Sequence, residues 1–171
     1  MANRYENAAR GVAESMIAAL PALLLAAAPA QAADACSGPA MLVTITGLKD
    51  RSGTIRVRSF GGSPSTYFDK KRYLRRTEIP TPQGGTVRVC MPVTASGWYA
   101  IDVRHDTNGN GKTDRADGGG ASGNPKISLL NVMLGNKPAA EKVRVWVGQG
   151  VTTVPVTVMY LKGGSFHPWE E

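Results

Sequence analysis

The stretch from residue 97 to residue 117 changes its pattern halfway, and this change constrains the fold more than any other feature of the chain. In its first half, Tyr99, Ile101 and Val103 alternate with mostly polar residues, which is typical of a β-strand with one buried face. The alternation ends at Asp106, where short oxygen-bearing side chains separated by glycine begin. The sequence therefore predicts a core strand that leads directly into a polar loop.

The spacing of oxygen donors in this loop matches a calcium-binding loop of the EF-hand type. Gly111 stands at position 6, where such a loop turns sharply, and Lys112 at position 7 offers its main-chain carbonyl. Calcium prefers six to eight hard oxygen ligands, so we expect residues 106–117 to bind Ca²⁺ with a dissociation constant of about 10⁻⁴ to 10⁻³ M. The candidate ligands are Asp106, Asn108, Asn110, Lys112, Asp114 and Asp117.

Three departures from the EF-hand pattern leave a metal-free loop open as an alternative, and the first is Thr113 at position 8, where an aliphatic residue is usual. Asp117 replaces the usual longer glutamate, and residues 118–120 are all glycine, so no helix follows the loop. Asparagine and aspartate side chains also form Asx-turns with nearby amides and need no metal to do so. The same residues could therefore order the loop by hydrogen bonds alone.

The N-terminal segment 1–32 has the features of a signal peptide. A polar start is followed by an apolar run over residues 16–30, and the run ends in a small-x-small cleavage site. Pro21 interrupts the run, which is shorter than the roughly 20 apolar residues that cross a bilayer. We expect cleavage after Ala32, no transmembrane segment in the mature chain, and a periplasmic or secreted location.

The chain contains two cysteines, Cys36 and Cys90, and both follow the predicted cleavage site. Exported proteins meet an oxidising compartment, so we expect these residues to form one disulfide. Two free thiols that serve as metal or redox groups are disfavoured, because the pair is widely spaced and is not a C-x-x-C motif.

The mature chain consists of short apolar or alternating segments separated by turn residues, with almost no helix signal. Pro92 should confine its segment to the edge of a sheet, because proline cannot donate to a strand ladder. Residues 65–76 could form a short helix or turn. The expected strand segments are 41–46, 54–60, 87–93, 97–105, 127–134, 143–147 and 154–160.

About seven strands at this spacing predict an all-β protein, namely an immunoglobulin-like or prealbumin-like β-sandwich of the Greek-key type. We expect the segments 41–46 and 54–60 to pair as a hairpin. The sandwich domain should span residues 33–162, and residues 163–171 should form a flexible C-terminal tail. Tyr99, two residues after a turn glycine, resembles the tyrosine corner of such sandwiches.

A basic cluster over residues 70–76 is the main alternative functional feature. It contains Lys70, Lys71, Arg72, Arg75 and Arg76, in a chain of net charge +7. Such a cluster could bind an anionic glycan or lipopolysaccharide at the outer-membrane surface, although a solvated loop is the simpler interpretation. No nucleic-acid-binding motif accompanies it, so nucleic acid is not an expected partner.

The sequence gives little support for catalysis, and we do not expect this protein to be an enzyme. His105 continues the apolar alternation of its strand, so it should pack beneath the loop or support it through a ring N–H. A hydrolase that uses His105 with Ser122 is the less favoured alternative, because no G-x-S-x-G motif surrounds the serine. An oxygen-rich donor set with one histidine also disfavours zinc.

The motifs around the loop are similar to those of the secreted bacterial domain-of-unknown-function family 2141. The resemblance covers nearly the whole mature chain, and its H-D-x-N-G-N-G-K core is specific. It implies an exported all-β domain to which no activity is assigned. The segments that carry it are Trp98-Tyr99-Ala100, His105-Asp106, Asn108-Gly109-Asn110-Gly111-Lys112 and Asp117-Gly118-Gly119-Gly120.

Overall fold

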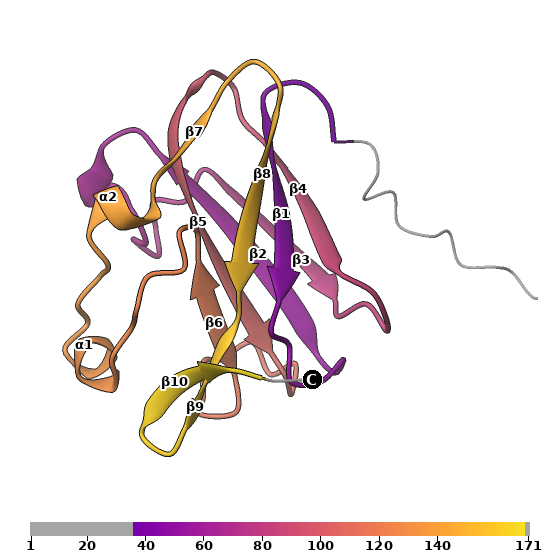
Figure 1. The fold of residues 1–171 in the computed structure, drawn as a ribbon, viewed down its shortest axis with the longest axis vertical. Coiled ribbons are helices and arrows are strands. Elements are labelled where there is room, and N and C mark those ends of the chain that lie inside the picture. The colour runs from indigo at the N-terminus through magenta and orange to yellow at the C-terminus, as the bar shows by residue number, and fades with distance from the viewer. Residues whose placement is uncertain (1–35, 170–171) are drawn as a thin grey trace, which may run out of the picture. The chain divides into compact units, whose positions relative to one another are not determined.

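The computed structural model describes residues 36–169, so the predicted signal peptide over residues 1–32 lies outside the described residues. Two β-sheets pack face to face (Figure 1), and the predicted all-β sandwich is confirmed. The described strands are β1 (Ala40–Thr46), β2 (Thr54–Gly61), β3 (Arg75–Pro80), β4 (Val87–Pro92), β5 (Gly97–Asp106), β6 (Gly118–Ala121), β7 (Val145–Val147), β8 (Val151–Thr157), β9 (Met159–Lys162) and β10 (Ser165–Pro168).

The smaller sheet has the strand order β4-β1-β8. Strand β1 pairs antiparallel with β4 and parallel with β8. Pro92 ends β4, which is an edge strand of this sheet, as the missing N–H of proline requires.

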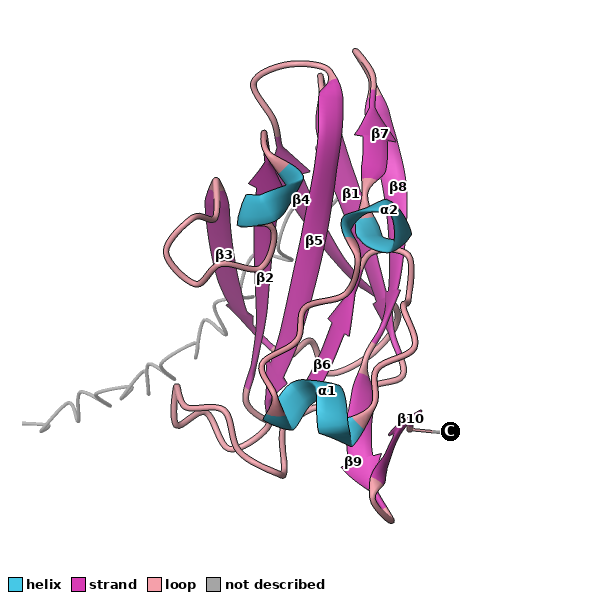
Figure 2. Ribbon diagram, turned by 90° about the vertical axis from the view of Figure 1, so that its left-hand side faces the viewer, coloured by secondary structure: helices cyan, strands magenta, loops and turns pink. Residues whose placement is uncertain are grey.

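The larger sheet has the order β10-β9-β6-β5-β2-β3, and β7 pairs with the start of β5. Strand β5 is the longest strand of the sheet (Figure 2). Its end at Asp106 lies beside the start of β6, because His105 pairs with Gly118. The 107–117 loop therefore closes a hairpin between two neighbouring strands.

The core lies between the sheets and is built from the apolar half of each alternating strand. Ile55 and Val57 of β2 and Ile101 and Val103 of β5 face Met41, Val43 and Ile45 of β1. These side chains are at most 3 % exposed, and full burial of each contributes about 1.5–3 kcal/mol. The apolar residues that alternate with a period of two in the sequence therefore share the inner face of each sheet.

A second apolar cluster covers part of the outer face of the larger sheet. It is supplied by strands of that sheet, by the segment after β2, and by the short helix α2 (Ala140–Val143). Its buried members are Phe60, Tyr67, Ala100, Ala121 and Val143.

The predicted hairpin between residues 41–46 and 54–60 is wrong. Strand β1 belongs to the smaller sheet and β2 to the larger one, so the two segments never pair. The connection buries Leu48 in the core, and Gly47 and Gly53 adopt positive φ angles of 73° and 65° at its two ends. Two glycines that accommodate sharp bends therefore allow the chain to change sheets.

The segment 127–134 contains the helix α1 (Leu129–Met133) instead of a strand. The side chain of Ser128 accepts a hydrogen bond from the amide of Asn131 and caps the helix. An apolar run without a clear period does not distinguish a strand from a short helix, and here the local cap accompanies the helix.

The predicted single strand over residues 154–160 is wrong, because this segment is divided between β8 of the smaller sheet and β9 of the larger one. Residues 65–76 were predicted to contain a short helix or turn, and the 3₁₀ turn η1 (Pro64–Thr66) agrees with the turn, whereas the strand β3 that begins at Arg75 was not predicted. The expected flexible tail over residues 163–171 contains β10, which pairs antiparallel with β9. Its polar composition does not reveal this pairing, since an edge strand needs only backbone hydrogen bonds on one side. Within residues 36–169, no helix is both long and apolar enough to span a bilayer.

Two predicted tertiary links are confirmed. Cys36 and Cys90 form a disulfide, with 5.4 Å between their Cα atoms, and this bond ties the start of the described chain to β4. The hydroxyl of Tyr99 donates a hydrogen bond to the main-chain oxygen of Ala95 at 2.7 Å. This contact is the one expected of a tyrosine corner.

Candidate functional site

Asp106, the first predicted ligand, is fully buried at the end of β5. Its Oδ1 accepts the amide of Asn110 at 3.2 Å, and its Oδ2 accepts the amide of Gly111 at 2.9 Å. Oδ2 also lies 2.7 Å from Nη2 of Arg104, which forms a buried ion pair with it. The loop is therefore folded back onto the carboxylate at its own start.

Asp117, the last predicted ligand, joins the two ends of the loop. Its Oδ1 accepts the amide of Thr107, and its Oδ2 accepts the amide of Asp114, each at 3.2 Å. The strand that follows passes close to its neighbours at two of its glycines: a Cβ on Gly118 would lie 2.5 Å from the ring of Tyr160, and one on Gly120 would lie 2.6 Å from the main-chain oxygen of Thr157. These close approaches give a structural reason for glycine at both positions.

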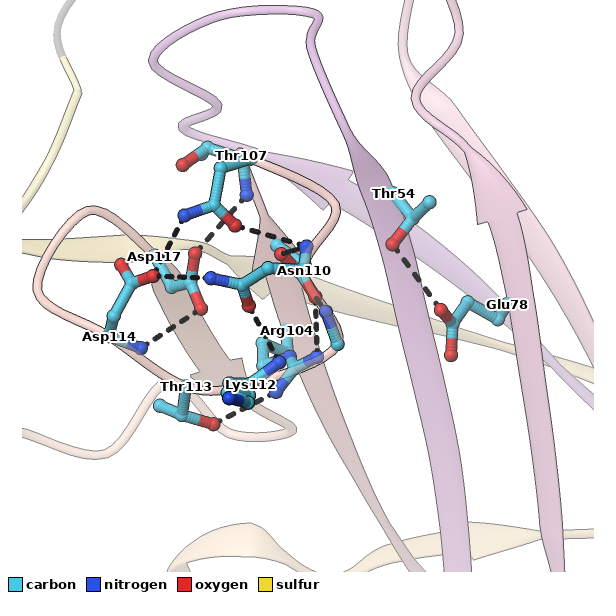
Figure 3. A network of polar contacts seen from close by, with 12 residues as sticks. Thr54, Glu78, Arg104, Thr107, Asn110, Lys112, Thr113, Asp114 and Asp117 are labelled. Carbon is cyan, nitrogen blue, oxygen red and sulfur yellow. Dashed lines mark hydrogen bonds and ion pairs between the residues drawn. The ribbon is translucent and has the colours of Figure 1, made fainter.

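The middle ligands meet at Asp114 (Figure 3). Its Oδ2 accepts the side-chain amides of Asn108 at 2.9 Å and Asn110 at 3.1 Å, and its Oδ1 accepts the main-chain amide of Ala116. The hydrogen bond from Asn108, followed by that from Ala116, lowers the pKa of Asp114 below its ordinary value, because these contacts favour the charged carboxylate. Five predicted ligand side chains thus belong to one network.

The loop also contains Asx-turns. Oδ1 of Asn108 accepts the amide of Asn110, and Oδ1 of Asn110 accepts the amide of Lys112. These are the contacts that the metal-free alternative requires. Among residues 36–169, no group of three or more His, Cys, Asp or Glu side chains is arranged to hold a metal ion.

His105 lies on the inner side of β5, with its side chain fully buried. Its Nδ1 is 2.5 Å from the hydroxyl of Tyr160, and its Nε2 is 2.8 Å from the main-chain oxygen of Ser52. A carbonyl only accepts, so Nε2 donates to Ser52, and in the neutral ring Nδ1 accepts from Tyr160. Ser52 in turn donates from its Oγ to the oxygen of Thr107, which links His105 to the first turn of the loop.

Ser122 is also fully buried. Its hydroxyl donates to the main-chain oxygen of Val143 and accepts the amide of Ile101 at 3.0 Å. Within the described chain, no hydrogen bond joins Ser122 to His105. Ser122 bonds main-chain groups, whereas His105 bonds the Tyr160 hydroxyl and the main-chain oxygen of Ser52, so the two side chains belong to separate hydrogen-bond networks.

The basic cluster of residues 70–76 is divided between two elements. Lys70, Lys71 and Arg72 are exposed in the turn after η1, whereas Arg75 and Arg76 begin β3. Nη2 of Arg76 forms an ion pair of 2.5 Å with Glu78. These residues therefore do not lie in one continuous loop.

The structure adds functional candidates that the sequence reasoning missed, namely the arginines on the outer face of the larger sheet. Arg56 and Arg58 of β2 and Arg104 of β5 lie on this face, and Arg104 contacts Asp106 of the calcium-loop candidate. The available signal was the polar half of each alternating strand, where arginines two residues apart share a face.

The comparison with protein families agrees with the family resemblance that the motifs around the loop indicate. Residues 43–155 match the model of a family described as an uncharacterized protein conserved in bacteria (DUF2141). The chain belongs to this family. The matched range contains the complete loop and most strands of both sheets. The comparisons with curated proteins and with solved structures found no match for this member of the family.

Proposed function

We propose that the protein is an extracytoplasmic β-sandwich module with a binding or structural role, and that Ca²⁺ orders its 106–117 loop. The Cys36–Cys90 disulfide supports the location, because such bonds persist in oxidising compartments. The observation that supports the calcium site most directly is the single network that joins Asp106, Asp114 and Asp117.

The donor set suits calcium. Three carboxylates, two amide oxygens and the main-chain oxygen of Lys112 offer hard ligands of the number that calcium prefers. The amides of Gly111 and Thr107 hold the outer carboxylates in place, so these groups are already oriented by the fold.

Calcium binding requires a local rearrangement. Asn108 and Asn110 direct their side-chain nitrogens toward Asp114. A half-turn of each amide about its last torsion angle would present oxygen in the same place, and it would break the Asx-turn bonds that the amides of Asn110 and Lys112 now donate. The ion would then replace the hydrogen bonds that now converge on Asp114.

The test is to measure calcium binding by the exported protein in two ways, by titration calorimetry and by thermal unfolding. At ten times the dissociation constant, Ca²⁺ should stabilise the fold by about 1.4 kcal/mol. Mg²⁺ should substitute poorly, because it demands a small octahedral cage. Asp114→Ala should abolish the stabilisation by Ca²⁺. Asp114 is preferable to Asp106 for this test, since loss of Asp106 would leave Arg104 buried without its carboxylate.

Glu141→Ala is the matched control, because Glu141 is an exposed carboxylate on α2 outside the loop. It should retain the full calcium response. Absence of both binding heat and a melting shift in the wild-type protein would refute the calcium site, as would an unchanged response in Asp114→Ala.

A further inference from the structure

Four arginines gather on the outer face of the larger sheet, on three adjacent strands. We call this group the arginine face. In the strand register, Arg56 stands opposite Arg104, and Arg58 stands opposite Arg76. The arginine face consists of Arg56 and Arg58 on β2, Arg76 on β3 and Arg104 on β5.

Three of these arginines have carboxylate partners. Arg58 pairs with Asp102 through two hydrogen bonds, Arg76 pairs with Glu78, and Arg104 pairs with Asp106. The three carboxylates of this region are therefore already engaged. Glu78 stands opposite Arg56 in the strand register but is bound by Arg76, so the fourth arginine is left without a carboxylate partner.

Arg56 is this fourth arginine, and among the described residues its side chain makes no hydrogen bond or ion pair. It is partly buried at the centre of the group, with Glu78 on one side already bound by Arg76 and Arg104 on the other. Like charges placed directly opposite each other across two strands are destabilising. Burial and the neighbouring Arg104 and Arg58 lower the pKa of Arg56 below the ordinary arginine value.

The Nε atoms of Arg56 and Arg104 are both buried and have no hydrogen-bond partner among the described residues. Arg104 itself is only 6 % exposed. A buried donor without an acceptor is costly, and the cost is larger when the group is charged. Two neighbouring guanidinium groups thus have unused donors in a place where both positive charge and unmade hydrogen bonds oppose folding.

We propose that Arg56, together with its register neighbour Arg104, binds an oxyanion: a carboxylate or phosphate group that is presented by a larger ligand. The planar fork of arginine matches these groups in two parallel hydrogen bonds. Such an anion would offset the two like charges, and it would satisfy the buried Nε donors once the two side chains part to admit it. Because Arg56 is only partly exposed, the anionic group enters between the side chains while the rest of the ligand stays in solvent.

The arginine face shares only Arg76 with the basic cluster of residues 70–76, and the proposed site at Arg56 and Arg104 shares no residue with it. The exposed lysines of that cluster attract anions by charge alone. The arginine face instead offers donors with fixed positions, held by the ladder between β2 and β5. We therefore expect binding at the arginine face to be selective for the geometry of the oxyanion and also to weaken as the salt concentration rises.

The test is titration calorimetry of the exported protein at low ionic strength with two probes, inorganic phosphate and glucuronate. Whichever probe binds more tightly identifies the preferred oxyanion. Arg56→Gln should raise its dissociation constant by about tenfold or more, as expected for loss of a hydrogen-bonded charge. Arg56→Lys should give an intermediate loss, because lysine retains the charge but lacks the fork.

Arg88→Gln is the matched control, since Arg88 is exposed on β4 in the other sheet and the substitution makes the same charge change. It should leave the dissociation constant unchanged. A second readout is the melting temperature without ligand, which should stay equal or rise in Arg56→Gln because a like-charge contact is removed. Binding that survives Arg56→Gln, equal losses in Arg88→Gln, no binding of either probe, or unfolding of Arg56→Gln would each overturn the proposal.

Discussion

The hydroxyl of Tyr160 and Nδ1 of His105 lie 2.5 Å apart, and this contact joins β9 to β5 inside the sandwich. Tyr160 is 3 % exposed. Burial raises the pKa of its hydroxyl to about 12, and the nearby negative charges of Asp50 and Asp117 act in the same direction. The neutral phenol is therefore strongly preferred in the folded protein.

The raised pKa of Tyr160 predicts alkaline instability. The folded-state pKa exceeds the value of about 10 for an unfolded tyrosine, so this contribution to stability is fully present below pH 10 and is lost as the pH rises toward 12. It amounts to about 3 kcal/mol at most, from two pKa steps of about 1.4 kcal/mol each. Urea unfolding at several pH values should show the decline.

Tyr160→Phe should flatten this alkaline decline, because phenylalanine has no proton to lose. It should also lower stability near neutral pH by about 1–3 kcal/mol, since Nδ1 of His105 loses its partner. Tyr73→Phe, at an exposed tyrosine, should retain the wild-type profile. A Tyr160→Phe profile as steep as that of the wild type would contradict the assignment.

The disulfide predicts a large loss of stability on reduction. Cys36 and Cys90 are 54 residues apart in sequence, so in the chain-entropy model their bond contributes about 4 kcal/mol. Serine at both positions should lower the free energy of unfolding by this order, as urea titration would measure. Reduced wild-type protein should match the double variant, and reactive thiols in the folded, oxidised protein would contradict the bond.

Gly53 marks a close approach between the connection after β1 and the end of β5. Its φ angle is 65°, and an added Cβ would lie 1.8 Å from the main-chain oxygen of Asp106. Gly53→Ala should therefore destabilise the protein by about 3 kcal/mol or more through strain and overlap together. Thermal unfolding would measure the change.

Gly109→Ala separates these two causes. Gly109 has the same φ of 65°, but an added Cβ would meet no atom within 4 Å. Its substitution should cost only the backbone strain of about 1–2 kcal/mol. Equal losses of stability in the two variants would show that the overlap with the main-chain oxygen of Asp106 does not contribute to the destabilisation.

The faces of the strands followed from the sequence, whereas their pairing did not. Alternation correctly placed Ile55, Val57 and Ile101 in the core, and the position of Tyr99 two residues after a turn glycine predicted its corner contact. It could not show that β1 pairs with β8, more than a hundred residues away. Pairing depends on contacts between distant segments, and a period of two is silent about the partner of a strand.

The candidate site shows the same division. The order of Asp106, Asp114 and Asp117 along the chain identified the loop, because ligand spacing is a local property. The ion pair between Arg104 and Asp106 was missed. Arg56 was missed for a different reason: its significance lies in lacking a partner, which only the arrangement of three strands reveals.

Arg104 touches both proposed sites, and this predicts coupling between calcium and the oxyanion. Its Nη2 binds Asp106 of the loop, its Nη1 donates to Thr113 at 2.9 Å, and its Nε is unpartnered beside Arg56. Calcium would add positive charge beside Arg104, so it should strengthen anion binding. By linkage, the anion should strengthen calcium binding by the same factor, typically about fivefold or more.

The measurement is a pair of calorimetric titrations of glucuronate with and without saturating Ca²⁺, and of Ca²⁺ with and without glucuronate. Phosphate is avoided here because it precipitates with calcium. Arg104→Lys should retain weak binding of each ligand but lose the coupling, because one ammonium group cannot replace three separate guanidinium donors. Coupling that is absent in the wild type, or unchanged in Arg104→Lys, would show that the two sites are independent.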